Sequence, residues 1–422
     1  MILFLWFIIF AEICIVIYKK CIFERSKVEI NHFFMFSLGF FFYFMLPILV
    51  LHLGMFQDEP GMSNLYILYN NIHKGKVVKL LISFWSIYSS FVFGSLLVEK
   101  RTKKKNKKLQ RIKKVNKVNI KILLVCNMPI LAYFIIVFRK SFMKGNLGQL
   151  SNATLRGTFV AYSLVFLAFS LFYTAYRYEK DTFLEKVCNP VSLIYIILAL
   201  LLLSLGGRLY FISSIFMVFV FKSVYFKKIK IINLFLGLIS CVFGAGTLGI
   251  VRMGIFKVKL SEVLFNVFAE SLYTSYSLIS FLSYDNVVKA FQMPKYLVSN
   301  FISMIPRVIL PTKEKFFLDP LLSGYTYVKP YGATNIYVSF NVNFGFLGML
   351  IAFFIIGMFM AWLKNGKQEL SMVIYIMICG FLGFTFFRDN FDVSLVKNIF
   401  EFSIVSPIAI YLICRIKIQN TN

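Results

Sequence analysis

Charged residues, and acidic residues above all, are scarce in this sequence of 422 residues. Charged residues make up only 15% of the chain, and 18 Asp and Glu stand against 46 Lys and Arg. Hydrophobic residues account for 59%, and the mean hydropathy is +0.77. So few charges cannot cover several soluble domains with a polar surface. The composition therefore excludes that class and favours a membrane protein.

Residue patterns that bind metals or nucleotides are also missing. The sequence has only three His and contains no Asp-x-Asp pair. Its seven Cys fall in predicted membrane spans or on the inner side, and their spacing fits neither a disulfide framework nor a metal site. The sequence contains no Walker A loop. We therefore expect no metal, no cofactor and no ATP-dependent step.

Apolar runs of about 17 or more residues recur along the whole sequence, and each is long enough to cross a bilayer. Because a backbone exposed to lipid must satisfy its own hydrogen bonds, such runs form helices. The sequence predicts one integral membrane domain over residues 1–422, all-α and polytopic, with about eleven transmembrane helices. The predicted spans are 2–18, 33–55, 77–98, 120–138, 158–176, 191–205, 209–226, 231–250, 344–363, 370–387 and 394–414.

Lys and Arg concentrate in alternate links between these spans, as the positive-inside rule requires. The densest cluster is the loop 99–121, which we interpret as cytoplasmic; the alternative is a patch that binds anionic lipid or nucleic acid. The pattern predicts a plasma-membrane protein with its N-terminus outside, its C-terminus in the cytoplasm and its first span retained as an anchor. The net charge of +28 then reflects topology, and we expect no nucleic-acid partner.

One link is far longer than the others and is predicted to be a large loop on the outer face, residues 251–341, between spans eight and nine. Its first part, "KLSEVLFNVFAESLYTSYSLISFLS", is typical of an amphipathic helix at a membrane interface. It continues with "IPRVILPTKEKFFLDP" and ends at "TNIYVSFNVNFGFLGML", where a Gly-x-x-Gly pattern leads back into the membrane. We expect any chemistry to lie in this loop.

Cations on the predicted outer face work against the positive-inside rule, so each needs a reason to be there. Arg208 is the clearest case, because the turn at Gly206-Gly207 requires no cation. A guanidinium offers a planar fork of donors that suits phosphate oxygens; the alternative is an arginine that reaches the headgroups or pairs with an acid. The predicted phosphate-binding cations are Arg156, Arg208, Arg252, Arg307, Lys313, Arg388 and Lys397.

Lys397 also has a second interpretation. It lies four residues before Glu401 on one face of the last predicted span. An ionisable pair inside a membrane helix indicates either a functional site or a structural ion pair. The sequence leaves both open.

Four short motifs occur in a recognisable order along the chain. They are Gly206-Gly207-Arg208 opening a span, Pro306-Arg307 followed by Pro311 and Lys313, Asn343-Phe344-Gly345 with Gly348, and Arg388 with Lys397. Together with the topology of the whole chain, they resemble the bacterial O-antigen polymerase family, which joins oligosaccharide repeat units. The resemblance implies a GT-C-like fold in the bacterial plasma membrane, which is the inner membrane in a Gram-negative cell.

The resemblance also implies a reaction and its partners. The substrates would be undecaprenyl-pyrophosphate-linked oligosaccharides at the outer leaflet, where the enzyme would build O-antigen for lipopolysaccharide, or capsule. Arginines facing the cavity would stabilise the pyrophosphate leaving group, so no metal would be needed. Besides membrane lipid, a chain-length regulator and a flippase of the same pathway would be partners.

An acceptor hydroxyl needs a group that takes its proton. The family often has an acidic residue shortly before its Asn-Phe-Gly segment, but Ser339 and Phe340 occupy that region here. The base therefore stays unassigned among the acidic residues predicted on the outer side. These are Glu262, Glu270, Asp285, Asp319 and Asp389.

Two other functions remain open from the sequence. A ligase that moves a finished polysaccharide from the same lipid carrier to another acceptor would share the architecture and the arginines. A flippase or exporter for lipid-linked oligosaccharides would spread polar groups through many spans and show related halves. Here the predicted spans are mostly apolar and the polar groups gather outside.

Overall fold

The computed structural model describes residues 1–23, 27–102, 117–138, 153–176, 189–204, 208–225, 227–237, 260–305, 309–329, 333–366 and 368–415. This part of the chain is all-α apart from three two-residue strands. Seven of its helices are long and apolar enough to cross a membrane: Ile2–Cys21, His32–Leu53, Lys74–Lys100, Lys121–Phe138, Gly157–Thr174, Ile336–Lys364 and Asp392–Arg415. Three shorter apolar helices span Val191–Leu203, Leu209–Tyr225 and Glu369–Leu382.

The elements of the first half are α1 (Ile2–Cys21), β1 (Ile22–Phe23), β2 (Lys27–Val28), α2 (His32–Phe40), η1 (Phe41–Met45), α3 (Leu46–Leu53), α4 (Met62–Asn70), α5 (Lys74–Thr102), α6 (Lys117–Phe138), α7 (Ala153–Tyr176), α9 (Pro190–Ser204), α10 (Arg208–Tyr225) and β3 (Ile229–Lys230). Those of the second half are α12 (Leu260–Ser283), α13 (Lys295–Asn300), η3 (Phe301–Met304), η4 (Lys313–Phe316), η5 (Pro320–Ser323), α14 (Ile336–Lys364), α15 (Glu369–Leu382), α16 (Thr385–Arg388), η7 (Asp392–Val405) and α17 (Ser406–Arg415).

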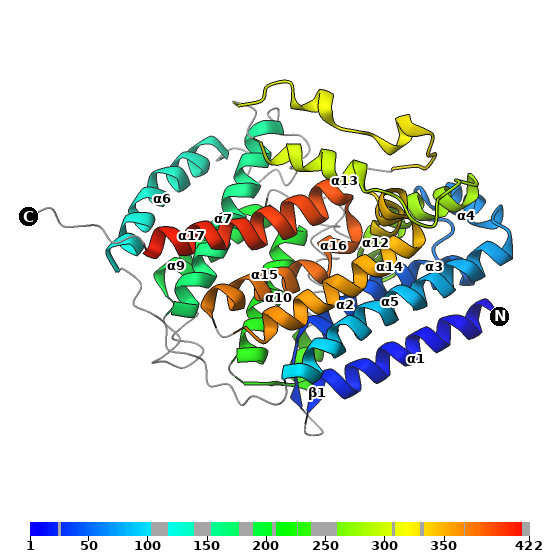
Figure 1. The fold of residues 1–422 in the computed structure, drawn as a ribbon, viewed down its shortest axis with the longest axis horizontal. Helices are drawn as coiled ribbons and strands as arrows, with labels where there is room; N and C mark the ends of the chain where they lie inside the picture. Colours follow the sequence, from blue (N-terminus) through cyan, green and yellow to red (C-terminus); the bar gives the residue numbers. More distant parts are fainter. Residues whose placement is uncertain are drawn as a thin grey trace, which may run out of the picture.

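Among the described elements, helices α5 and α14 make the most extensive contact, and they lie side by side in Figure 1. Glycines make this approach possible. A Cβ on Gly94 would lie 2.2 Å from the carbonyl oxygen of Phe354, and one on Gly357 would lie 2.2 Å from that of Phe91. Small residues at such a contact bring two backbones together, as is common between membrane helices.

Salt bridges connect the C-terminal ends of three helices, α1, α5 and α14. Lys20 at the end of α1 pairs with Glu99 near the end of α5 at 2.8 Å, and Lys364 at the end of α14 pairs with Glu29 at 2.6 Å. Nearby, β2 pairs antiparallel with both β1 and β3. The C-terminal ends of these helices therefore lie together, and the helices run in the same direction.

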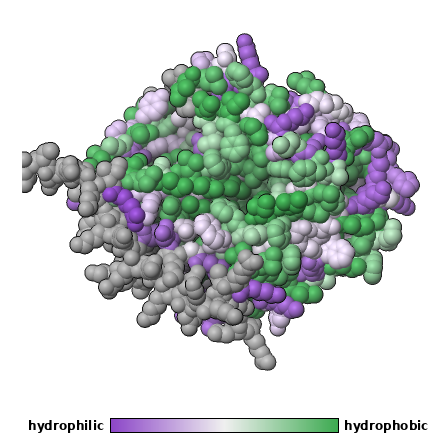
Figure 2. Space-filling view, viewed as in Figure 1, coloured by the Kyte–Doolittle hydropathy of each residue, from purple (hydrophilic) through white to green (hydrophobic). Residues whose placement is uncertain are grey.

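Helix α15 is buried along most of its length. Every residue from Met372 to Leu382 is buried, and α15 packs against α10, α7, α14 and η7. The apolar surface of the molecule is extensive as well. Figure 2 shows hydrophobic side chains across the middle of the visible face and hydrophilic ones mainly towards its edges. This distribution fits an all-α protein whose helices face lipid.

Helix α14 begins earlier than the sequence indicates. The predicted loop extends to residue 341 and the predicted span begins at 344, whereas the helix starts at Ile336, where the side chain of Asn335 accepts a hydrogen bond from the backbone of Tyr337. The segment that the sequence predicts as an amphipathic interfacial helix forms helix α12. It packs against α3, α4, η1 and α14. Its serine-rich face is buried there.

Candidate functional site

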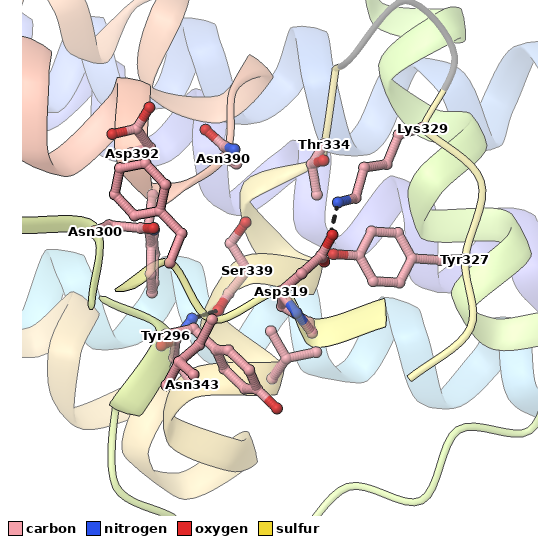
Figure 3. Close-up of a pocket in the computed structure, with 15 residues that line it drawn as sticks. Tyr296, Asn300, Asp319, Tyr327, Lys329, Thr334, Ser339, Asn343, Asn390 and Asp392 are labelled. Carbon is pink, nitrogen blue, oxygen red and sulfur yellow. Dashed lines mark hydrogen bonds and ion pairs between the residues drawn. The ribbon is translucent and has the colours of Figure 1, made fainter. Parts of the chain in front are cut away.

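A polar cavity of about 230 Å³ lies between the segment 295–329, the beginning of α14 and the beginning of η7. Figure 3 shows polar side chains from all three parts turned towards one another. Its polar lining consists of Tyr296, Asn300, Asp319, Tyr327, Lys329, Thr334, Ser339, Asn343, Asn390 and Asp392. Phe317, Leu318, Pro320, Val342 and Phe391 supply the apolar remainder.

Helix α14 is broken at Gly345, two residues after Asn343 of the cavity lining. The backbone of Gly345 has a φ of 71°, a conformation that residues with a side chain rarely adopt. A Cβ at this position would lie 2.1 Å from the carbonyl oxygen of Lys289. The backbone of Leu347 donates to the carbonyl of Ala290 at 2.9 Å. Glycine is therefore required for the segment around 290 to pack against the broken helix.

Asn343, two residues before the break, fixes the same segment by its side chain. Its Nδ2 donates to the carbonyl of Ser339 at 2.8 Å, and its Oδ1 accepts from the backbone of Leu297 at 2.7 Å. The break in α14 leaves backbone carbonyls without a helical partner. Gln292 satisfies one of them, because its Nε2 donates to the carbonyl of Asn341 at 3.0 Å. The Asn343-Phe344-Gly345 motif thus joins the long segment to α14.

Asp319 and Lys329 form an ion pair on one wall of the cavity. The Nζ of Lys329 lies 3.4 Å from Oδ1 of Asp319, as the dashed line in Figure 3 marks. The same Oδ1 accepts from the backbone of Leu321 at 3.0 Å and so begins η5. Lys329 also lies over the ring of Tyr327, 5.3 Å from its centroid. Burial, followed by the charge of Asp319, raises the pKa of Tyr327 above its ordinary value.

Asp392 and Lys397 form the second ion pair, on the opposite wall. Lys397 donates to Oδ2 of Asp392 at 3.0 Å, five residues away. The sequence indicated a partner four residues away, Glu401, because that spacing aligns side chains in an α-helix. Here η7 is a π-helix, in which residues five apart face one another. Oδ1 of Asp392 is buried and has no hydrogen-bond partner among the described residues.

A third cluster of charges consists of Arg388, Glu270 and Asp389. Asp389 directly precedes Asn390, a residue of the cavity lining. Arg388 is ion-paired with Glu270 of α12 and lies 3.3 Å from Oδ1 of Asp389. Burial raises the pKa of Asp389, Arg388 lowers it and Glu270 raises it, so the net direction is upwards. Burial lowers the pKa of Arg388, but Glu270 and Asp389 raise it by more.

Two tyrosines lie beside this third cluster. Helix α10, which carries Tyr210, packs against α16, which carries Arg388, and the charges of Arg388 and Asp389 act on the hydroxyls of Tyr43 of η1 and Tyr210. Tyr210 is in the first turn of α10, the helix that Arg208 opens. The structure therefore brings the beginning of α10 close to Arg388.

Several residues that the sequence predicted for the site fall outside the described part of the chain. Arg252 and Arg307 do so entirely, and so do the side chains of Arg156, Arg208 and Glu262.

Of the predicted site residues whose side chains the structure describes, only Asp319 lines the cavity. Those outside its lining are Glu270, Asp285, Lys313, Arg388, Asp389 and Lys397. Lys313 donates to the carbonyls of Ser303 and Ile305 at 2.9 and 2.8 Å, so its ammonium holds a turn of the long segment. Asp285 pairs with Lys76 and is largely exposed.

Some lining residues were not predicted from the sequence at all. Lys329, Asn300 and Thr334 reach the cavity from the long segment and from the residues just before α14. Asn390 follows Arg388 by two residues, which is the signal that could have identified it. Nothing in the local sequence marks the first three.

The described residues contain no group of three or more His, Cys, Asp or Glu that could hold a metal ion. Comparisons with protein-family models, with curated proteins and with solved structures find no match for this chain. The chemistry of the cavity therefore has to be argued from its own residues. They offer carboxylates held by ammonium groups, side-chain amides, hydroxyls and aromatic rings.

Proposed function

We propose that this protein is a membrane glycosyltransferase that joins undecaprenyl-pyrophosphate-linked oligosaccharide repeat units into O-antigen or capsular polysaccharide. It would act on the outer face of the bacterial plasma membrane. The observation that carries this proposal is the polar cavity at one end of an apolar helix bundle, where the Asn343-Phe344-Gly345 motif meets Asp319 and Asp392. Such a cavity beside lipid-facing helices suits a substrate with a polar head and a lipid tail.

In the proposed reaction, a hydroxyl oxygen of the acceptor unit attacks the anomeric carbon of the growing glycan. The bond from that carbon to the pyrophosphate oxygen breaks, and its electron pair leaves with undecaprenyl pyrophosphate. The hydroxyl proton passes to a carboxylate within hydrogen-bond reach. Two carboxylates of the described residues line the cavity, and the lysine pairs keep each in a defined position.

The leaving pyrophosphate needs positive charge near the site. Arg388 is already balanced by Glu270 and Asp389, so this cluster alone carries no excess positive charge. Arg208, Arg252 and Arg307 are the cations that we assign to the pyrophosphate. The closeness of the start of α10 to Arg388 supports Arg208 in this role.

The test is deletion of the gene, followed by gel analysis of the surface glycan. We expect single repeat units in place of long chains, with restoration by the wild-type protein. Unchanged chain lengths would rule the proposal out. Loss of all surface units would favour a flippase, and long chains that stay on the lipid carrier would favour a ligase.

Complementation with variants then tests the cavity. Asp392→Asn keeps the shape of the side chain and removes its charge, so we expect the strain to make only single units. Asp58→Asn makes the same change at an exposed carboxylate outside the cavity and should restore full chains. Both variants must be present in the membrane at the wild-type level.

A further inference from the structure

The lining of the cavity has the chemical character of a sugar-binding surface. Five side-chain amides and hydroxyls line it, those of Asn300, Asn343, Asn390, Ser339 and Thr334. Amides and hydroxyls both donate and accept hydrogen bonds, as the hydroxyls at the rim of a pyranose do. Aromatic side chains stand among them and offer flat apolar faces to the C–H groups of a sugar ring.

The charges in the cavity argue against an anionic ligand. Among the described residues, its lining carries two carboxylates, Asp319 and Asp392, and one ammonium group, that of Lys329. Lys329 pairs with Asp319, and Lys397 pairs with Asp392 from outside the lining. Each carboxylate is thus neutralised, and the described residues of the lining leave no positive charge over. A pyrophosphate would find no surplus cation there, whereas an uncharged polyol would find acceptors that are already in place.

Thr334 supplies an independent observation. Its side chain is 2% exposed and lines the cavity, yet its Oγ1 has no hydrogen-bond partner among the described residues. Buried hydroxyls in folded proteins are almost always paired, so an unpaired one at a cavity wall indicates a ligand group that pairs with it. Figure 3 shows Thr334 next to Lys329, on the wall opposite Asn300.

The size of the cavity further limits which ligands it can enclose. At about 230 Å³ it is smaller than the roughly 300–1,000 Å³ of sites that enclose a whole drug-sized molecule. It has room for the end of an oligosaccharide, with the remainder of the chain outside. We propose that the cavity binds the terminal, uncharged sugar of the acceptor repeat unit, and that the pyrophosphate lies elsewhere; this assignment to the acceptor rests on the proposed function.

The test measures binding directly, with the full-length protein in detergent. The probes are oligosaccharides of one to three repeat units, obtained by partial hydrolysis of the strain's own surface polysaccharide, and inorganic pyrophosphate as competitor. Saturation-transfer NMR should detect the oligosaccharides, and an equal concentration of pyrophosphate should leave their signals unchanged. Displacement of the oligosaccharide by pyrophosphate would overturn the assignment.

Three variants make the measurement specific. Thr334→Val removes one hydroxyl at constant shape, and Asn300→Ala removes an amide; each should raise the Kd for the oligosaccharide about five- to tenfold. Thr312→Val makes the first change at an exposed position of the same segment and should leave the Kd unchanged. Thermal unfolding of Thr334→Val should be at or above the wild-type temperature, because the lost hydroxyl has no partner within the protein.

The failure of this inference is distinguishable from the failure of the proposed function. If the deletion strain lacks long chains but both cavity variants bind oligosaccharide as the wild type does, the cavity is not the sugar site. If deletion leaves chain lengths unchanged while the variants lose binding, the cavity binds sugar in a protein that is not the polymerase.

Discussion

Arg388 is ion-paired with Glu270, a residue from a helix that lies more than 100 positions earlier in the chain. This pair joins α16 to α12 and sets the distance between the segment leading into η7 and the long segment that follows α12. Asp389 adds a second carboxylate to the same guanidinium at 3.3 Å. The three charges are partly buried, with side-chain exposures of 29%, 29% and 14% for Arg388, Glu270 and Asp389.

Removing the charge of Glu270 and removing that of Asp389 should change the stability of the protein in different ways. Glu270→Gln removes the interhelical ion pair, and we expect it to lower the free energy of unfolding by about 1–3 kcal/mol. Asp389→Asn removes a charge that burial and Glu270 both disfavour, so it should be neutral or slightly stabilising at pH 7. Thermal unfolding of both purified variants in detergent checks this. A larger loss in Asp389→Asn than in Glu270→Gln would contradict it.

The raised pKa of Asp389 also predicts a dependence on pH. The folded protein holds the Asp389 proton more tightly than the unfolded chain, whose value is 3.8. The stability that this group contributes is therefore fully present below pH 3.8 and is lost as the pH rises through the folded pKa. The advantage of Asp389→Asn over the wild type should be largest at pH 7 and shrink towards pH 4. A constant difference across that range would count against a raised pKa.

Gly345 is the position at which a single methyl group should do most damage to the site. Gly345→Ala meets both a backbone conformation, φ 71° and ψ −179°, that is almost confined to glycine and costs other residues about 1–3 kcal/mol, and the carbonyl of Lys289 at 2.1 Å. Gly324→Ala is the matched control, because Gly324 has a φ of 95° but no atom within 4 Å of the added Cβ. We expect Gly345→Ala to unfold at a clearly lower temperature than Gly324→Ala. Equal losses would show that the contact with Lys289 is not tight.

The sequence was informative wherever a signal is local. Long apolar runs predicted helices of membrane-spanning length, and the Asn343-Phe344-Gly345 motif marked the place where the long segment returns to the bundle. It was less informative where distant parts of the chain meet. Nothing near Arg388 indicates Glu270 as its partner, and nothing near Lys329 indicates a cavity.

A local rule also failed inside one helix. The spacing of Lys397 and Glu401 predicts a pair only if the helix is an α-helix, and the sequence does not show that η7 has the wider π-helical turn. The backbone N–H of Ser406 donates to the carbonyl of Glu401, five residues earlier. The side-chain hydroxyls of Ser403 and Ser406 also donate to carbonyls five residues earlier, those of Asn398 and Glu401. π-Helical turns are rare and often occur at functional sites. The π-helix η7 therefore coincides with the candidate site, because its first residue, Asp392, lines the cavity.

The pair between Lys397 and Asp392 allows a last prediction, on both stability and activity. Lys397→Met leaves the carboxylate of Asp392 without its cation, so we expect both a loss of about 1–3 kcal/mol in stability and loss of long glycan chains. Asp392→Asn in the same chain removes the unpaired charge. The double variant should then recover most of the stability, measured by thermal unfolding, while still making single units. Recovery of long chains together with stability would mean that Asp392 serves only to hold η7 in place.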